Sequence, residues 1–179
     1  MSNSFIMWSM LFIPWLSLYF MKKEEVKRWM PVAMFAVVLT TIIHDVGTTL
    51  GYWITLESTF PFYQMLPYYY GTMPVLTIWV FKFTYGHFGR YFVTNTVLDI
   101  GFNFFLLNYV LPSRGILGFN ISPSPSVLIT LMHAVVIYGY QMWQDGILLD
   151  TKNIISNNIQ PAAAKPLSNQ QEDKTEDSE

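Results

Sequence analysis

Five long apolar stretches, separated by short polar connections, constrain the fold of this chain more than any other feature. Each stretch is 17 to 25 residues long, and a helix needs about 20 apolar residues to cross the hydrocarbon core of a bilayer. The stretches cover residues 5–21, 29–53, 67–83, 92–111 and 127–144. The sequence therefore predicts an all-α fold, a polytopic membrane helix bundle with five transmembrane helices.

The basic residues predict an orientation for this bundle. If every stretch crosses the membrane once, nine of the ten lysines and arginines lie in connections on one side, and Arg114 alone lies on the other. The nine are Lys22, Lys23, Lys27, Arg28, Lys82, Arg90, Lys152, Lys165 and Lys174. Basic flanks are retained in the cytoplasm. We therefore expect a multi-pass protein of the cell membrane with its N-terminus outside and its C-terminus inside.

Composition excludes several classes of function. Charged residues make up 12% of the chain, against roughly 25% in an average soluble domain. There is no cysteine, which excludes disulfides, thiol nucleophiles and thiolate metal sites. A net charge of −2 gives no indication of a nucleic-acid partner. The expected partners are the lipid bilayer and other membrane proteins, and no cofactor is predicted.

The end of the chain differs from the rest. From Asp145 onward there are seven acidic residues and three lysines, and apolar residues become sparse after residue 150. Segments of this composition bury too little apolar surface to fold. We expect a transmembrane domain over residues 1–150 and a disordered acidic cytoplasmic tail over 151–179. The Ser-Pro-Ser-Pro-Ser run at 122–126 is expected to be extended rather than helical, because proline disfavours helix at the residue before it.

Ionisable and amide residues inside the predicted spans are the candidate functional site. Such groups are costly in a membrane, face the bundle interior and often mark function. The candidate cluster consists of His44, Asp45, Asn95, Asp99, Asn103 and His133. Helical spacing puts His44 and Thr48 opposite an apolar stripe that includes Phe35 and Trp53, with Asp45 on the flank of the polar face. The cluster is therefore expected to join the second, fourth and fifth helices.

Three interpretations of the cluster remain open. The side chains can fix helix register through interhelical hydrogen bonds, worth about 0.6 kcal/mol each on average. They can instead form a proton or ion pathway, with Asp45 and Asp99 as exchange sites and the histidines as relays. Two histidines and two carboxylates can also bind a divalent metal, but no His-x-x-x-His pair supports this, and no metal site is predicted.

Two other patterns predict packing and depth. On the fourth helix, the apolar stripe Val93, Val97, Ile100, Phe104, Leu107 and Leu111 is expected to face lipid. Aromatic residues near the predicted helix ends, among them Trp53 and Tyr68 to Tyr70 outside and Trp29 and Tyr91 inside, are typical of interfacial belts. Gly47-x-x-x-Gly51 fits a close helix-packing motif.

No enzyme signature accompanies these features. The chain has no Gly-x-Ser-x-Gly elbow and no His-Glu-x-x-His pair. We interpret it as a non-enzymatic structural or accessory protein that associates with other membrane components. The alternative is a small proton- or ion-coupled carrier that uses Asp45 and Asp99.

Several short motifs resemble a group of small five-helix membrane proteins from spore-forming Gram-positive bacteria. They are Ile13-Pro14-Trp15-Leu16 followed by Lys22-Lys23, the stretch Arg28 to Ala33, and Phe83-Thr84-Tyr85-Gly86 leading to Thr94-Asn95 and Leu98-Asp99. The similarity covers most of residues 1–143. It implies a five-helix membrane fold and carries no activity to this chain.

Overall fold

The computed structural model describes residues 2–63 and 65–158. The protein is mostly helical, at 77%, which confirms the predicted helical class. The chain divides into two units, residues 1–142 and 143–179. Of the second unit, the structure describes the end of helix α6.

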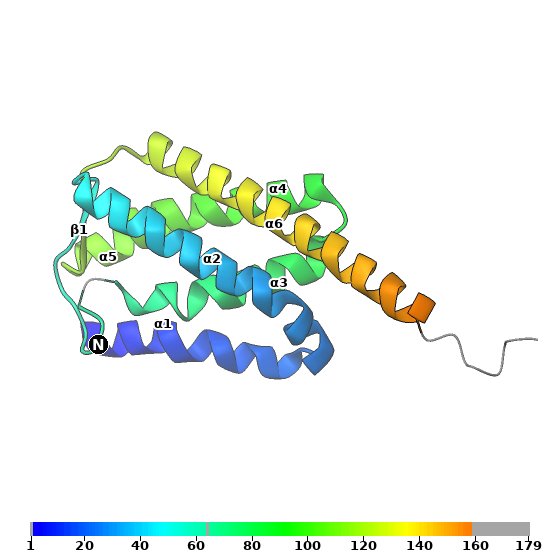
Figure 1. The fold of residues 1–179 in the computed structure, drawn as a ribbon. Coiled ribbons are helices and arrows are strands. Elements are labelled where there is room, and N and C mark those ends of the chain that lie inside the picture. Colours follow the sequence, from blue (N-terminus) through cyan, green and yellow to red (C-terminus); the bar gives the residue numbers. More distant parts are fainter. Residues whose placement is uncertain (1, 64, 159–179) are drawn as a thin grey trace, which may run out of the picture. The chain divides into compact units, whose positions relative to one another are not determined.

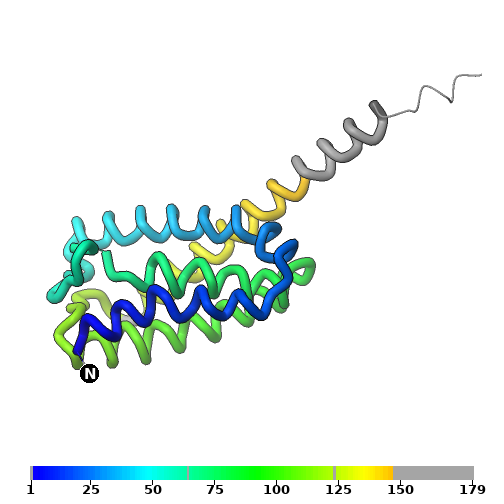
Figure 2. The backbone as a smooth tube through the Cα atoms, turned by 90° about the horizontal axis from the view of Figure 1, so that it is seen from below, coloured from blue at the N-terminus to red at the C-terminus, as the bar shows by residue number. Residues whose placement is uncertain are grey.

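The first unit is built from helices joined by short turns, and Figures 1 and 2 show them running side by side. Its helical elements are α1 (Asn3–Ser17), the 3₁₀ turn η1 (Leu18–Phe20), α2 (Lys23–Thr49), the 3₁₀ turn η2 (Pro67–Tyr69), α3 (Thr72–Thr84), α4 (Phe88–Gly101), the π-helix η3 (Phe102–Val110), the single turn α5 (Leu111–Ser113) and the start of α6 (Pro123–Asn158). Helices α2 and α3 pack against each other, as do α1 and α3.

The long helix α2 has clear start and stop signals. Its first turn carries Glu24 and Glu25, which suit the positive end of the helix dipole. The Glu25 carboxylate also accepts an ion-paired hydrogen bond from Lys82 Nζ at 2.9 Å, so the same residue ties the start of α2 to the end of α3. After Thr49 the chain turns at Gly51, whose φ of 73° is the left-handed conformation that glycine adopts without strain.

Within the described residues, three helical stretches are long and apolar enough to cross a membrane: Asn3–Phe20, Lys23–Thr49 and Ser124–Gly146. The predicted spans 67–83 and 92–111 are not among these three stretches. Residues 67–83 form η2 and most of α3, and residues 92–111 lie in α4, η3 and α5. Helix α3 begins only at Thr72 and has 13 residues, or about 20 Å at 1.5 Å per residue. The second region is a continuous helical rod in which α4, η3 and α5 follow one another.

A small sheet at one end of the helices was not predicted. Strands β1 (Trp53–Thr55) and β2 (Leu117–Phe119) pair antiparallel, with Trp53 opposite Phe119 and Thr55 opposite Leu117. The all-α prediction is wrong in this detail. The predicted span 29–53 also ends too late, because Gly51 stops α2 and Trp53 belongs to the strand.

Buried apolar side chains form two clusters in the first unit. One contains Trp29, Val32, Ala33, Ile78, Phe81 and Tyr91 together with Ala134 and Ile137 of α6. The other contains Met7, Leu66, Tyr68, Tyr69, Leu107 and Ile116. Trp29, Tyr68, Tyr69 and Tyr91 are at most 9% exposed. The interfacial belt prediction is wrong for these four, because their rings fill the core.

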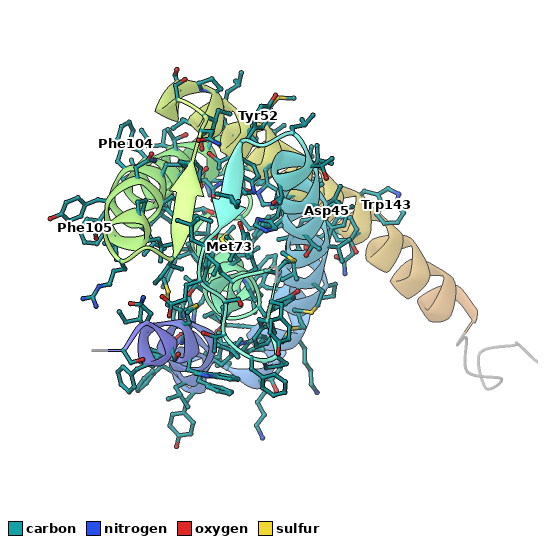
Figure 3. All side chains as sticks on the ribbon, turned by 90° about the vertical axis from the view of Figure 1, so that its left-hand side faces the viewer. Asp45, Tyr52, Met73, Phe104, Phe105 and Trp143 are labelled. Carbon is teal, nitrogen blue, oxygen red and sulfur yellow. The ribbon has the colours of Figure 1, made fainter. Side chains whose placement is uncertain are left out.

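The outward faces of the helices are apolar. Exposed large side chains include Phe12 and Leu16 on α1, Val38 and Val46 on α2, and Val97 on α4. Figure 3 shows Phe104 and Phe105 of η3 projecting away from the neighbouring helices. Water-exposed apolar surface on this scale is unusual for a soluble monomer, whereas a lipid environment makes it favourable.

Two expectations near α6 require correction. The helix starts at Pro123, so residues 123–126 of the Ser-Pro run are helical rather than extended. Prolines are tolerated in a first turn, because the N–H groups there have no partner within the helix. The helix also continues to Asn158, so the first eight residues of the predicted tail, 151–158, are helical. The rest of that tail, 159–179, lies outside the described residues.

Candidate functional site

A layer of polar side chains separates the two apolar clusters. On α2, Thr40 and His44 follow the buried run that ends at Ala36, and both are buried. On the rod formed by α4 and η3, Asp99 and Asn103 lie between Tyr91 of one cluster and Leu107 of the other. Helix α6 adds three more, Ser126, Thr130 and His133. We call these seven residues the polar layer.

His133 is tied to α2 by Thr40. Its Nε2 lies 3.0 Å from Thr40 Oγ1. The Thr40 hydroxyl also donates to the Ala36 carbonyl at 2.7 Å. Thr40 therefore links His133 to the backbone of α2.

His44 makes its contacts nearer the sheet end of the molecule. Its Nδ1 lies 2.9 Å from the hydroxyl of Tyr69, and Trp53 Nε1 donates to the His44 carbonyl at 3.3 Å. Trp53 is 8% exposed, so its expected position in the lipid-facing stripe is wrong. It packs on Gly47, where a Cβ would collide with its ring, and the Gly47-x-x-x-Gly51 motif is not a helix-packing pair, because Gly51 lies beyond the helix.

Asn103 is the most fully bonded member of the layer. Its Nδ2 donates to the Asp99 carbonyl at 2.9 Å, and its Oδ1 accepts from Ser126 Oγ at 2.6 Å. Its own carbonyl accepts from Asn108 Nδ2 at 2.7 Å. The side chain is fully buried. Asn103 therefore joins the π-helix to the start of α6.

Asp99 has fewer bonds. Asn95 Nδ2 donates to its Oδ2 at 3.4 Å, which is long for a hydrogen bond to a carboxylate, and the Thr130 hydroxyl also donates to the carboxylate. Asp99 and Asn95 lie together with Thr130, His133 and Tyr91 around an internal cavity of about 70 Å³. We call this the Asp99 cavity.

A second internal cavity of about 80 Å³ lies beside the first. Its polar lining includes His44, Tyr69, Asn103 and Ser126. The two cavities share Met73, Phe102 and Thr130, and Met73 lies among the helices in Figure 3. Cavities of this size have room for a water molecule, and the polar groups lie on a minor part of a mainly apolar lining.

Asp45 does not belong to the layer. It is exposed, and with Thr41, Thr48 and Thr49 it lines an open groove of about 560 Å³ between α2 and the connection from α2 to α3. We call this the outer groove. One residue along a helix is a rotation of about 100°, which is why His44 points inward and Asp45 does not. Five of the six predicted residues thus surround the internal cavities, and Asp45 stands apart, although His44 lines both the groove and the second cavity.

The predicted lipid-facing stripe of the fourth span is only partly exposed. Val93, Val97, Ile100 and Phe104 are exposed, but Leu107 and Leu111 are buried. The change occurs inside η3. A π-helix has more residues per turn than an α-helix, because its bonds run from i to i+5, so residues beyond Phe104 rotate away from the face that an α-helical pattern assigns to them.

Several residues of the site had no signal in the sequence pattern. Thr40, Ser126 and Tyr69 supply partners to the predicted histidines and to Asn103, and the Tyr91 hydroxyl donates to the Ala134 carbonyl at 2.8 Å. Within the described ranges, no three His, Cys, Asp or Glu side chains come together as a metal-binding group. Comparison of the chain with family models, with curated proteins and with solved structures gives no match.

Proposed function

We propose that this chain is an integral membrane protein that crosses the bilayer five times and acts by associating with other membrane components, without catalysing a reaction. Helices with the length and composition of membrane spans support this proposal, as do their exposed apolar faces. The hydrogen bonds of the polar layer support a packing role for most of its members.

The position of Asp45 is the main observation that supports the proposed association. Asp45 lies about one turn before the end of a helix that can span a membrane, and it is exposed. It makes no hydrogen bond or ion pair within the part of the chain that the structure describes. A carboxylate near the end of a membrane span is costly unless it reaches water or a polar partner. A polar partner seated in the outer groove removes that cost, so the groove favours contact with another membrane component.

Site-specific photo-crosslinking tests the association. A photoreactive residue in place of Ile42, which lines the groove, should give a discrete adduct in intact membranes. The matched control is Val97, equally exposed on the apolar face of α4. Asp45→Asn should reduce the Ile42 adduct at least about tenfold, the effect of losing about 1.4 kcal/mol. Equal adducts at both positions, unaffected by Asp45→Asn, would contradict the proposal.

The proposed topology places the N-terminus outside and the C-terminus in the cytoplasm. The chain has no cysteine, so single cysteines can be introduced without background. Exposed Ser58 and Ser124 should react with an impermeant maleimide in intact cells when each is changed to cysteine. His87→Cys, in the connection between α3 and α4, should react only after lysis, because the positive-inside rule puts this connection in the cytoplasm. Labelling of position 87 from outside would refute the orientation.

A second candidate is a proton- or ion-coupled carrier. The observation that favours it is the position of His44, which lines both the outer groove beside Asp45 and the internal cavity that adjoins Asp99. This arrangement supports a route between the two carboxylates. A carrier must move its ion, so gradient-driven flux in proteoliposomes, absent in Asp99→Asn, distinguishes it from an accessory protein.

A further inference from the structure

The Asp99 cavity has an unusual balance of donors and acceptors. Its polar lining consists of one carboxylate, one imidazole and four neutral oxygen-bearing side chains, the remaining residues are apolar, and neither lysine nor arginine is among them. The neutral groups are Asn95, Thr77, Thr130 and Tyr91. An ionised Asp99 in this position therefore lacks a counter-charge from the residues around the cavity.

Each of the three hydroxyl groups around the cavity donates a hydrogen bond to a backbone carbonyl. Thr77 Oγ1 donates to the Met73 carbonyl at 2.9 Å, and Tyr91 donates to the Ala134 carbonyl at 2.8 Å. Thr130 Oγ1 shares its hydrogen between the Val127 carbonyl, at 2.9 Å, and the Asp99 carboxylate. Each hydroxyl has one hydrogen. Thr77 and Tyr91 can therefore offer the cavity only lone pairs, which attract a cation and cannot stabilise the carboxylate.

His133 is a further polar residue of the cavity lining. Its imidazole lines the cavity, and its Nε2 lies 3.0 Å from Thr40 Oγ1 on α2. Two side chains donate hydrogen bonds to the carboxylate, Asn95 at 3.4 Å and Thr130. A half-buried carboxylate with two neutral donors and no basic side chain in the lining keeps its negative charge unless it is protonated or neutralised by a bound cation.

We propose that the Asp99 cavity binds a small monovalent cation of the sodium type. One carboxylate balances one positive charge, and oxygen ligands suit hard cations. A divalent ion would leave an excess positive charge in the membrane interior, because no second carboxylate lines the cavity. The volume of about 70 Å³ is enough for a small ion and water. The site is independent of the proposed association at Asp45.

Sodium-dependent stability of the full chain in detergent tests the site. The midpoint of thermal unfolding is measured as NaCl replaces choline chloride at constant ionic strength. A ligand that binds only the folded state raises the midpoint with the logarithm of its concentration. We expect such a rise with Na⁺ and saturable binding of radioactive ²²Na⁺ at one ion per chain. A midpoint insensitive to Na⁺, or one raised equally by Ca²⁺, overturns the proposal.

Two pairs of variants locate the ion. Asp99→Asn should abolish the Na⁺ dependence, whereas Asp45→Asn, outside the cavity, should keep it. Thr77→Val removes one oxygen and should weaken Na⁺ binding about tenfold. Its matched control is Thr96→Val, since Thr96 also donates to a carbonyl four residues earlier but lines neither internal cavity. Equal Na⁺ dependence in the two threonine variants would overturn the assignment, even if Asp99→Asn fails to fold.

Discussion

Gly71→Ala should destabilise the protein by about 3 kcal/mol, at the upper end of the usual cost of overpacking. Gly71 lies just before α3, where the chain meets the backbone of α1. An added Cβ would lie 2.5 Å from Leu11 Cα and closer still to the carbonyl oxygens of Met10 and Leu11. These are backbone atoms, so no change of rotamer relieves the collision.

The bonds around Gly71 explain why the contact is so close. Thr72 Oγ1 donates to the Met10 carbonyl at 3.0 Å, and Trp15 Nε1 donates to the Tyr70 carbonyl at 3.1 Å. Both bonds join α1 to the start of α3. A helix pushed away by the new methyl group would lose them as well.

The loss is measured as the free energy of unfolding in mixed micelles with increasing SDS. Gly139→Ala is the matched control, because an added Cβ there meets nothing within 4 Å. That variant should not be destabilised, because alanine is favoured over glycine inside a helix by about 0.5–1 kcal/mol. Similar values for the two variants would show that α1 does not pack at Gly71 as described.

The apolar lengths in the sequence predict most of the helical architecture, because a stretch of 17 to 25 apolar residues has few alternatives to a helix. They do not predict where the helices end. Gly51 stops α2 two residues before Trp53, and the paired strands β1 and β2 depend on contacts between connections more than 60 residues apart. Such a pairing leaves no local signal in either segment.

Helical periodicity is informative about faces only while the helix keeps its period. It distinguishes the inward His44 from the apolar positions Ile42 and Val46, which are both exposed. Periodicity gives the wrong answer for Asp45. This residue lies on the flank of the polar face and was predicted to join the interior cluster, but its side chain is exposed. Periodicity fails again at Leu107 and Leu111, where the π-helix changes the period. A sequence pattern contains no information about that change, since the π-helix is stabilised by tertiary contacts such as the Asn103–Ser126 bond.

Asn103→Ala should cost about 2 kcal/mol, more than the average interhelical hydrogen bond in a membrane protein, about 0.6 kcal/mol. The larger cost arises because the substitution leaves the Ser126 hydroxyl without its acceptor. Ser126 is buried, and its hydroxyl donates to Asn103 Oδ1 at 2.6 Å. Without that acceptor the hydroxyl stays buried and unsatisfied, which costs about 1–3 kcal/mol. Asn108→Ala is the control, because its amide only adds a bond to the Asn103 carbonyl, and it should cost less than about 1 kcal/mol.

A double-mutant cycle separates the lost bond from the stranded hydroxyl. Ser126→Ala removes the group that Asn103→Ala strands, so the double variant should be more stable than the sum of the two single losses by about 1 kcal/mol. Such coupling would mean that the Asn103–Ser126 bond locks the π-helix to the start of α6, beside the cavity that both residues line. Additive losses, each near 0.6 kcal/mol, would mean that packing alone holds α6 in place, and the interpretation of Asn103 as an interhelical lock would then be wrong.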